Sequence, residues 1–131
     1  MTRMPTITLH AIPHNKHRYE TVGDWQIKPG AIDIAVSRMD NADYEFCVAL
    51  HELVEAWLCL RRGVDDRDVT EFDERFEADR KAGAHSETEE PGDSPLAPYR
   101  DEHFTATTIE RMVAAELGVD WAKYDAKINS L

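Results

Sequence analysis

Cysteine is scarce in this sequence, which contains only Cys47 and Cys59. Both cysteines fall in a stretch that we predict to be one helix, and their separation of twelve residues corresponds to about 18 Å along the helix axis. That distance is too long for a disulfide bond. We therefore expect two free thiols that pack as small core residues, and a reducing compartment.

Positive charge is also scarce. The chain has 15 lysine and arginine residues against 26 aspartate and glutamate residues, and its formal net charge is −11. A field of this sign repels the phosphates of nucleic acids and the surface of an anionic membrane. We therefore expect neither nucleic acid nor a membrane among the partners of the protein.

Long apolar runs are missing too. No run approaches the roughly 18 residues of a transmembrane helix, and Met1 to Pro5 leads into a strand pattern without the apolar core of a signal peptide. The sequence therefore predicts a cytoplasmic protein. A chain of 131 residues that is 42% hydrophobic fits one domain over residues 1–131, which can bury a core without disulfides or a structural metal.

Three segments near the start of the chain have the pattern of β-strands. Residues 6–12 alternate apolar and polar side chains, residues 19–27 are a second candidate, and residues 32–37 resume the alternation. Pro13 and the Pro29-Gly30 turn separate these segments. Together they predict a small antiparallel or mixed sheet.

The pattern then changes to the 3.6-residue period of helices. The longest helix is expected between an N-terminal cap at Asp40-Asn41 and a stop at Gly63. Residues 66–81 and 100–117 predict two more main helices, and Asp120 is placed to cap a short last helix. The predicted fold class is therefore α+β, with a small N-terminal sheet followed by three main helices and a short C-terminal helix.

Two polar segments connect these elements. Residues 83–98 contain several acidic side chains and three prolines, and they predict a long solvated loop. His10, His14 and His17 lie on both sides of a proline in a predicted turn. We interpret these three histidines as exposed turn residues.

Apolar side chains predict the buried faces of two of the helices. His51 and Glu55 lie at the edge of the first apolar stripe, whereas Glu110 lies inside the second stripe and His103 lies at its border. Helices that pack through these stripes bring the four polar side chains toward one another. The first stripe is Phe46, Leu50, Leu53, Val54, Trp57 and Leu58, and the second is Ala106, Ile109, Val113 and Leu117.

The segment His51-Glu52-Leu53-Val54-Glu55 has the clearest chemistry. On a helix, His51 and Glu55 are one turn apart and project side by side, while Glu52 lies about 100° away. This arrangement suits two metal ligands and a nearby base. His103, Glu110 and Asp73 are further candidate ligands, and a mixed set of nitrogen and carboxylate donors suits zinc, with catalysis at an open coordination position.

The same segment resembles the zincin metalloproteases. Their core is a strand followed by a helix bearing His-Glu-x-x-His, in which the two histidines bind zinc and the glutamate activates water. The stretch from Ala49 through the helix at 100–117, including Gly92-Asp93, Ala97-Pro98-Tyr99-Arg100 and His103, is also similar to small uncharacterised proteins of phages and prophages.

The resemblance implies a zincin-like fold and a zinc site. Carried over position by position, it makes His51 and Glu55 ligands, Glu52 the general base, and His103 the third ligand in place of the downstream residue of the family. Glu55 departs from the family pattern, because it replaces the second histidine. A carboxylate there adds negative charge and weakens the Lewis acidity of the metal, so the resemblance favours a metal site more than it favours proteolysis.

The sequence supports three hypotheses about function. The leading one is a zinc-dependent, metallopeptidase-like hydrolase, or a degenerate descendant of one, acting on an unknown peptide or small-molecule substrate. The second is an acidic adaptor of phage origin that binds a protein partner and uses a metal only to tie its helices together. The third resembles the all-helical nucleotide pyrophosphatases, with magnesium held by Glu52, Glu55, Glu71, Asp73 and Glu74.

Overall fold

The computed structural model describes residues 3–131 and confirms an α+β fold within that range. Met1 and Thr2, the start of the segment expected to lack a signal peptide, lie outside the described residues. In the described range, no helix is long and apolar enough to cross a membrane. The elements in chain order are β1 (Thr6–Ile12), η1 (His14–Lys16), β2 (Gly23–Lys28), β3 (Ala31–Ser37), α1 (Ala42–Arg62), α2 (Asp66–Lys81), η2 (Pro91–Asp93), α3 (Arg100–Glu116) and α4 (Trp121–Asn129).

The three strands form a mixed sheet with the order β1-β3-β2. Strand β3 is central, because β1 pairs with it in parallel and β2 pairs with it in an antiparallel hairpin closed at Gly30. Ile32, Ile34 and Val36 point from β3 into the core, as their period-two spacing predicts. The mixed alternative for the sheet is therefore the one that the structure adopts.

The second strand is shorter than predicted, because it begins at Gly23 and not at Tyr19. The hydroxyl of Thr21 donates a hydrogen bond to the carbonyl of Gly23, and this local bond competes with pairing to a neighbouring strand. Tyr19 instead reaches the side chain of Asp73 on α2. The segment before β2 therefore contacts α2 through Tyr19.

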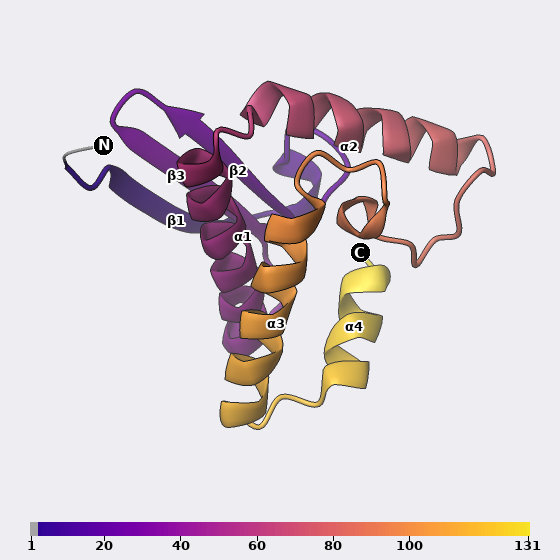
Figure 1. The fold of residues 1–131 in the computed structure, drawn as a ribbon. Coiled ribbons are helices and arrows are strands. Elements are labelled where there is room, and N and C mark those ends of the chain that lie inside the picture. The colour runs from indigo at the N-terminus through magenta and orange to yellow at the C-terminus, as the bar shows by residue number, and fades with distance from the viewer. Residues whose placement is uncertain (1–2) are drawn as a thin grey trace.

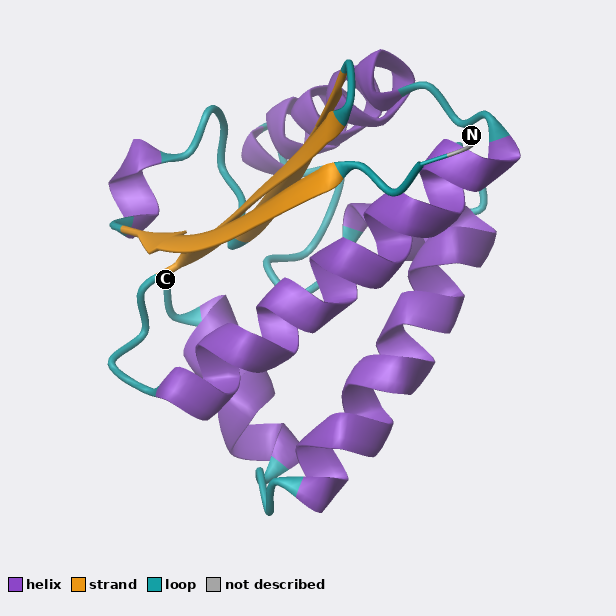
Figure 2. Ribbon diagram, turned by 90° about the vertical axis from the view of Figure 1, so that its left-hand side faces the viewer, coloured by secondary structure: helices purple, strands orange, loops and turns teal. Residues whose placement is uncertain are grey.

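Helix α1 lies between the sheet and α3, which run along its two sides (Figure 2). Its ends follow the predicted signals. The side chain of Asn41 accepts a hydrogen bond from the backbone N–H of Tyr44, and Gly63 ends the helix in the left-handed conformation. The predicted boundaries of α2 are confirmed, and α3 ends at Glu116, one residue earlier than predicted.

The buried faces of α1 and α3 differ from the predicted stripes. Phe46 is 51% exposed and Leu117 is 42% exposed, although both were expected in the core. The helices pack closely through small residues such as Ala56 and Ala106, and this close approach turns the larger side chains outward. The buried residues are Cys47, Val48, Ala49, His51, Glu55, Ala56 and Cys59 on α1, and Glu102, His103, Ala106, Glu110 and Ala114 on α3.

Helices α2 and α4 complete the arrangement of the helices. In Figure 1, α2 crosses over the end of α3, and α4 turns back beside α3 toward the C-terminus. The expected loop at residues 83–98 returns the chain from α2 to α3 and contains the short helix η2. Cys47 and Cys59 are buried free thiols, as the sequence predicts.

Candidate metal centre

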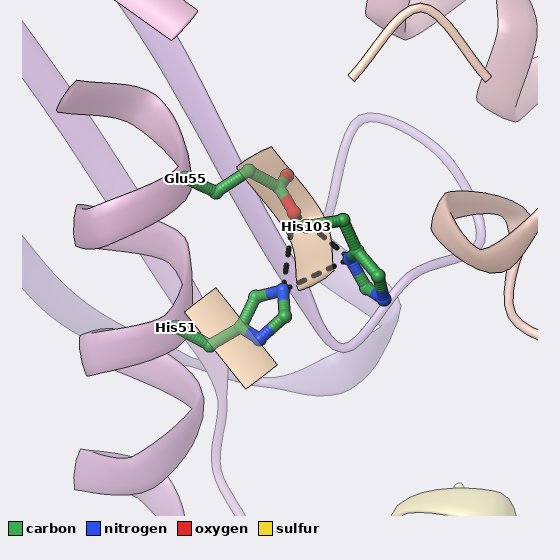
Figure 3. Close-up of side chains that lie close together, drawn as sticks. All are labelled: His51, Glu55 and His103. Carbon is green, nitrogen blue, oxygen red and sulfur yellow. Dashed lines mark hydrogen bonds and ion pairs between the residues drawn. The ribbon is translucent and has the colours of Figure 1, made fainter. Parts of the chain in front are cut away.

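Three side chains bring one donor atom each to the same point between α1 and α3 (Figure 3). His51 Nε2 lies 3.1 Å from Glu55 Oε2 and 3.1 Å from His103 Nδ1. The distance from His103 Nδ1 to Glu55 Oε2 is 2.9 Å. The structure therefore brings together two helix neighbours of α1 and a residue that lies 52 positions away from His51 in the sequence.

This triangle has nearly the dimensions of a zinc coordination sphere. Zinc binds imidazole nitrogen and carboxylate oxygen at about 2.0–2.2 Å in tetrahedral geometry, which places neighbouring donor atoms about 3.3 Å apart. The separations of 2.9–3.1 Å need to widen by only a few tenths of an ångström. Three protein donors leave a fourth tetrahedral position for water or substrate.

The second nitrogen of His51 is held by Glu110. His51 Nδ1 lies 2.8 Å from Glu110 Oε1, and the hydroxyl of Tyr124 donates to Glu110 Oε2 at 2.6 Å. A carboxylate on the outer nitrogen keeps the proton there and leaves the inner nitrogen of the imidazole with its lone pair toward the centre. Glu110, predicted as a ligand, thus contacts the candidate ligand His51 and lies outside the group of converging donor atoms.

Glu55 and His103 are held in the same way. The indole N–H of Trp25 on β2 donates to Glu55 Oε1 at 2.9 Å, which leaves Oε2 pointing toward the two imidazoles. His103 Nε2 lies 3.1 Å from Glu90 and 3.4 Å from Asp93, so an outer carboxylate again orients an inner nitrogen. Each of the three donors therefore has a fixed orientation before any ion binds.

Gly92 allows the loop before α3 to lie directly against His103. A Cβ atom at Gly92 would lie 2.4 Å from Cγ and Nδ1 of the His103 ring, which is closer than any real contact. The backbone conformation at position 92 does not require a glycine. Among the glycines of residues 3–131, positive φ is found only at Gly30, Gly63, Gly83 and Gly118. The absence of a side chain at Gly92 therefore serves the position of His103.

The pKa values of the three donors show how strongly they interact. Burial raises the pKa of Glu55, but hydrogen bonds from His103 and His51 outweigh burial and lower it to about 2. Burial lowers the pKa of His103, but hydrogen bonds to Glu55 and Glu90 raise it to about 10. For His51, hydrogen bonds to Glu110 and Glu55 likewise outweigh burial and raise the pKa well above its ordinary value. Protons therefore occupy the place where a cation fits.

Glu52 lines the same cavity as the three donors. Its carboxylate packs against Gly23 at the start of β2, where a Cβ atom would lie 2.7 Å from Glu52 Oε1. Burial raises the pKa of Glu52 well above its ordinary range, and the charge of Glu55 raises it further. The predicted base thus lies beside the converging donors, in a position that depends on a second close glycine.

Asp73, the remaining predicted ligand, does not join the converging donors. It accepts hydrogen bonds from the hydroxyls of Tyr19, at 2.9 Å, and Tyr99. Burial raises the pKa of Asp73 to about 7, even though both tyrosine hydrogen bonds act in the opposite direction. Asp73 nevertheless lines the cavity that contains His51, Glu55 and His103, which has a volume of about 440 Å³.

Two other predicted groups do not form metal sites in the described part of the chain. Glu71 and Glu74 are exposed on α2 and do not gather with Glu52 and Glu55, as the magnesium hypothesis requires. His14 and His17 are half-buried, and they hydrogen-bond to Ser37 Oγ at 2.8 and 2.9 Å. The expectation of exposed histidines was wrong for these two and right for His10.

The sequence prediction missed the residues that support the donors. Trp25, Tyr124 and Glu90 come from three separate elements, and no local spacing connects them to His51 or His103. Gly23 and Gly92 are close to side chains on other elements, so the local sequence does not show why glycine is needed there. Comparisons with protein-family models, with curated proteins and with solved structures found no match to this chain.

Replacing Glu110 with Gln tests whether the outer carboxylate supports the site. We expect about a 10- to 100-fold loss of zinc affinity, because an amide holds the His51 proton less strongly than a carboxylate does. Competition against a chromophoric chelator measures the affinity. Glu116→Gln, an exposed change on the same helix, is the matched control, and equal affinities in the two variants would rule out a role for Glu110 in the metal site.

Proposed function

We propose that this chain is a zinc-dependent hydrolase of metallopeptidase-like chemistry, with His51, Glu55 and His103 as ligands. The observation that carries the proposal is the convergence of three donor atoms within 2.9–3.1 Å, each oriented by a separate partner. Structural ion pairs need no such point of convergence. Two nitrogens and one oxygen form the mixed donor set that suits zinc.

The site also has the other parts that hydrolysis requires. A bound zinc ion would supply Lewis acidity and would lower the pKa of water, so that water becomes a better nucleophile at neutral pH. Glu52 lies in the cavity beside the donors, where it is placed to take a proton from the attacking water and pass it to the leaving group. The cavity of about 440 Å³ gives room for a short peptide segment or a small molecule.

The zincin-like character of the fold is part of this proposal. Its support is the strand and helix arrangement, with His51, Glu52 and Glu55 on α1 and the third ligand on a later helix. Glu55 makes the ligand set more anionic than two histidines and one neutral donor, which reduces the Lewis acidity of the metal. We therefore expect slower hydrolysis than from a site in which both positions are histidine.

Metal content is the first test of the proposal. We expect protein purified without an affinity tag or chelator to contain about one zinc ion per chain. The two groups of converging donors, His51 with Glu55 and His103, and Glu90 with Asp93 and His103, share His103, and only the first group is fully buried. His51→Ala and His103→Ala should each lose the metal, whereas the exposed His10→Ala should retain it. Elemental analysis by mass spectrometry gives the stoichiometry.

Either result of this test is informative. Loss of zinc in both site variants, with retention in His10→Ala, supports the centre and justifies a screen with quenched fluorogenic peptides and activated esters. Absence of zinc in the native chain, even after incubation with the ion, would contradict the proposal. The acidic binding module would then explain the protein better.

A further inference from the structure

The cavity around the candidate centre is strongly anionic. Ten carboxylate side chains line it, and Arg80 is the single lysine or arginine among the described lining residues. A zinc ion compensates only two of these charges. The carboxylates are Glu20, Asp24, Glu52, Glu55, Asp73, Glu77, Glu87, Glu89, Glu90 and Glu110.

The arginines near the cavity are already engaged. Arg80 pairs with Glu77 at 3.0 Å and also donates to the carbonyls of Ser86 and Glu89. Arg18 makes two hydrogen bonds of 2.8 Å to the carboxylate of Asp24. Neither guanidinium therefore compensates the carboxylates deeper in the cavity.

Asp73 is one of the carboxylates in this cavity without a basic partner among the described residues. Within residues 3–131, no lysine or arginine forms a salt bridge with it, and its hydrogen bonds come from the neutral hydroxyls of Tyr19 and Tyr99. The tyrosines hold one oxygen each, so the carboxylate has a fixed orientation. A carboxylate has about four acceptor positions, and the two tyrosine hydrogen bonds leave the others for a further donor.

We propose that Asp73 binds a cationic group of the substrate, an ammonium or a guanidinium, in the cavity that holds the candidate zinc centre. This inference rests on the proposed function for its link to catalysis, and it names the substrate class as one with a basic side chain or amine. Glu52 and Asp24 lie near Tyr19 and add negative potential to the same wall of the cavity. A cation relieves this repulsion, whereas a neutral group leaves it and an anion increases it.

Calorimetric titration of three peptides tests the proposal. The probes are acetylated and amidated tripeptides with a central arginine, leucine or glutamate between two alanines, titrated into zinc-loaded protein. We expect the arginine peptide to bind at least about tenfold more tightly than the leucine peptide, because a charged donor on a partly buried carboxylate is a strong hydrogen bond. The glutamate peptide should bind most weakly.

Asp73→Asn should reduce the ratio of arginine to leucine affinity to about one, since an amide keeps the size of the side chain but loses its charge. Asp79→Asn is the matched control, because it removes the same charge from an exposed position on α2. The zinc content of both variants should equal that of the native protein. Equal affinities of the native protein for all three peptides, or an unchanged ratio in Asp73→Asn, would overturn the proposal.

The two proposals fail separately. Asp73 lies outside the converging donors, so the titrations are repeated on zinc-free protein, and the arginine preference is expected there as well. If the protein prefers the arginine peptide but does not bind zinc, the hydrolase proposal is wrong and the proposed cation site stands. If the protein binds zinc but does not prefer the arginine peptide, the proposed cation site is wrong and the proposed metal centre stands.

Discussion

Glu52→Gln is expected to reduce hydrolysis by about 10²- to 10⁴-fold while the zinc content stays unchanged. This range is typical for the loss of a general base. The amide has the same shape as the carboxylate but does not accept the proton of the attacking water. Because Glu52 lines the cavity but is not one of the converging donors, the change should remove one chemical role and leave metal binding intact.

The position of Glu52 allows its role as a base to be tested separately from metal binding. Glu52 follows the proposed ligand His51 directly in the sequence, yet it lies against the backbone of Gly23 on a different element. Within residues 3–131 the carboxylate of Glu52 accepts no hydrogen bond that the variant would lose, so the variant should fold normally. Zinc content and the thermal unfolding midpoint, both equal to those of the native protein, are the checks on folding.

Glu74→Gln is the matched control for this prediction. Glu74 is exposed on α2 and belongs to the carboxylate cluster of the magnesium hypothesis. Hydrolysis of nucleoside triphosphates with magnesium but not zinc, lost in both variants, would support that hypothesis instead. Full activity in Glu52→Gln would exclude Glu52 from the mechanism.

The sequence predicted most of the fold because local rules determine it. Alternation in β3 and the Asn41 cap and Gly63 stop of α1 are signals that involve only near neighbours. The parallel pairing of β1 with β3 is a long-range choice. Local patterns do not encode it, so the sequence left both sheet types open.

The helix faces were harder to predict because polar residues occupy the buried side. Large apolar residues normally mark that side, but on α1 the core contains His51 and Glu55 and excludes Phe46. Burial of these polar groups is tolerable only because partners on other elements satisfy them. A pattern that assigns polar residues to solvent therefore predicts the wrong face where polar groups are buried, as at this candidate site.

The candidate site could be predicted in part. The spacing of His51 and Glu55 is local, and the packing of two amphipathic helices suggested His103, so the three converging residues were all among the candidates. Glu110 and Asp73 were harder to assign from the sequence. A position near the site does not show whether a carboxylate faces the converging donors or a neighbouring side chain. Only the contacts to His51, and to Tyr19 and Tyr99, distinguish these cases.

Zinc affinity is expected to rise steeply with pH, by up to about tenfold per pH unit for each proton that the metal displaces. The carboxylates around His103 raise its pKa to about 10, and the pKa of His51 is also raised well above its ordinary value. His103 therefore keeps its extra proton at neutral pH, and the pKa of His51 is shifted in the same direction. Zinc must displace these protons, and raising the pH removes the competition.

Chelator competition at pH 6.5, 7.5 and 8.5 measures this dependence, with each pH value chosen relative to an ordinary histidine pKa of about 6.5. Ligands with ordinary pKa values give affinities that level off above pH 7.5, whereas the present site should continue to gain affinity up to pH 8.5. Glu90→Gln should flatten the rise, because it removes one of the carboxylates that raise the pKa of His103. A flat profile in the native protein would contradict the proton occupancy that we infer.

The same protons determine the stability of the metal-free protein. A histidine whose pKa is raised on folding contributes stability below its unfolded pKa of about 6.5, and this stability is lost as the pH rises toward the folded value. For His103 the loss extends from about pH 6.5 to about 10. Zinc replaces the protons as the partner of Glu55, so the gain in unfolding temperature on adding zinc should increase with pH over the same range.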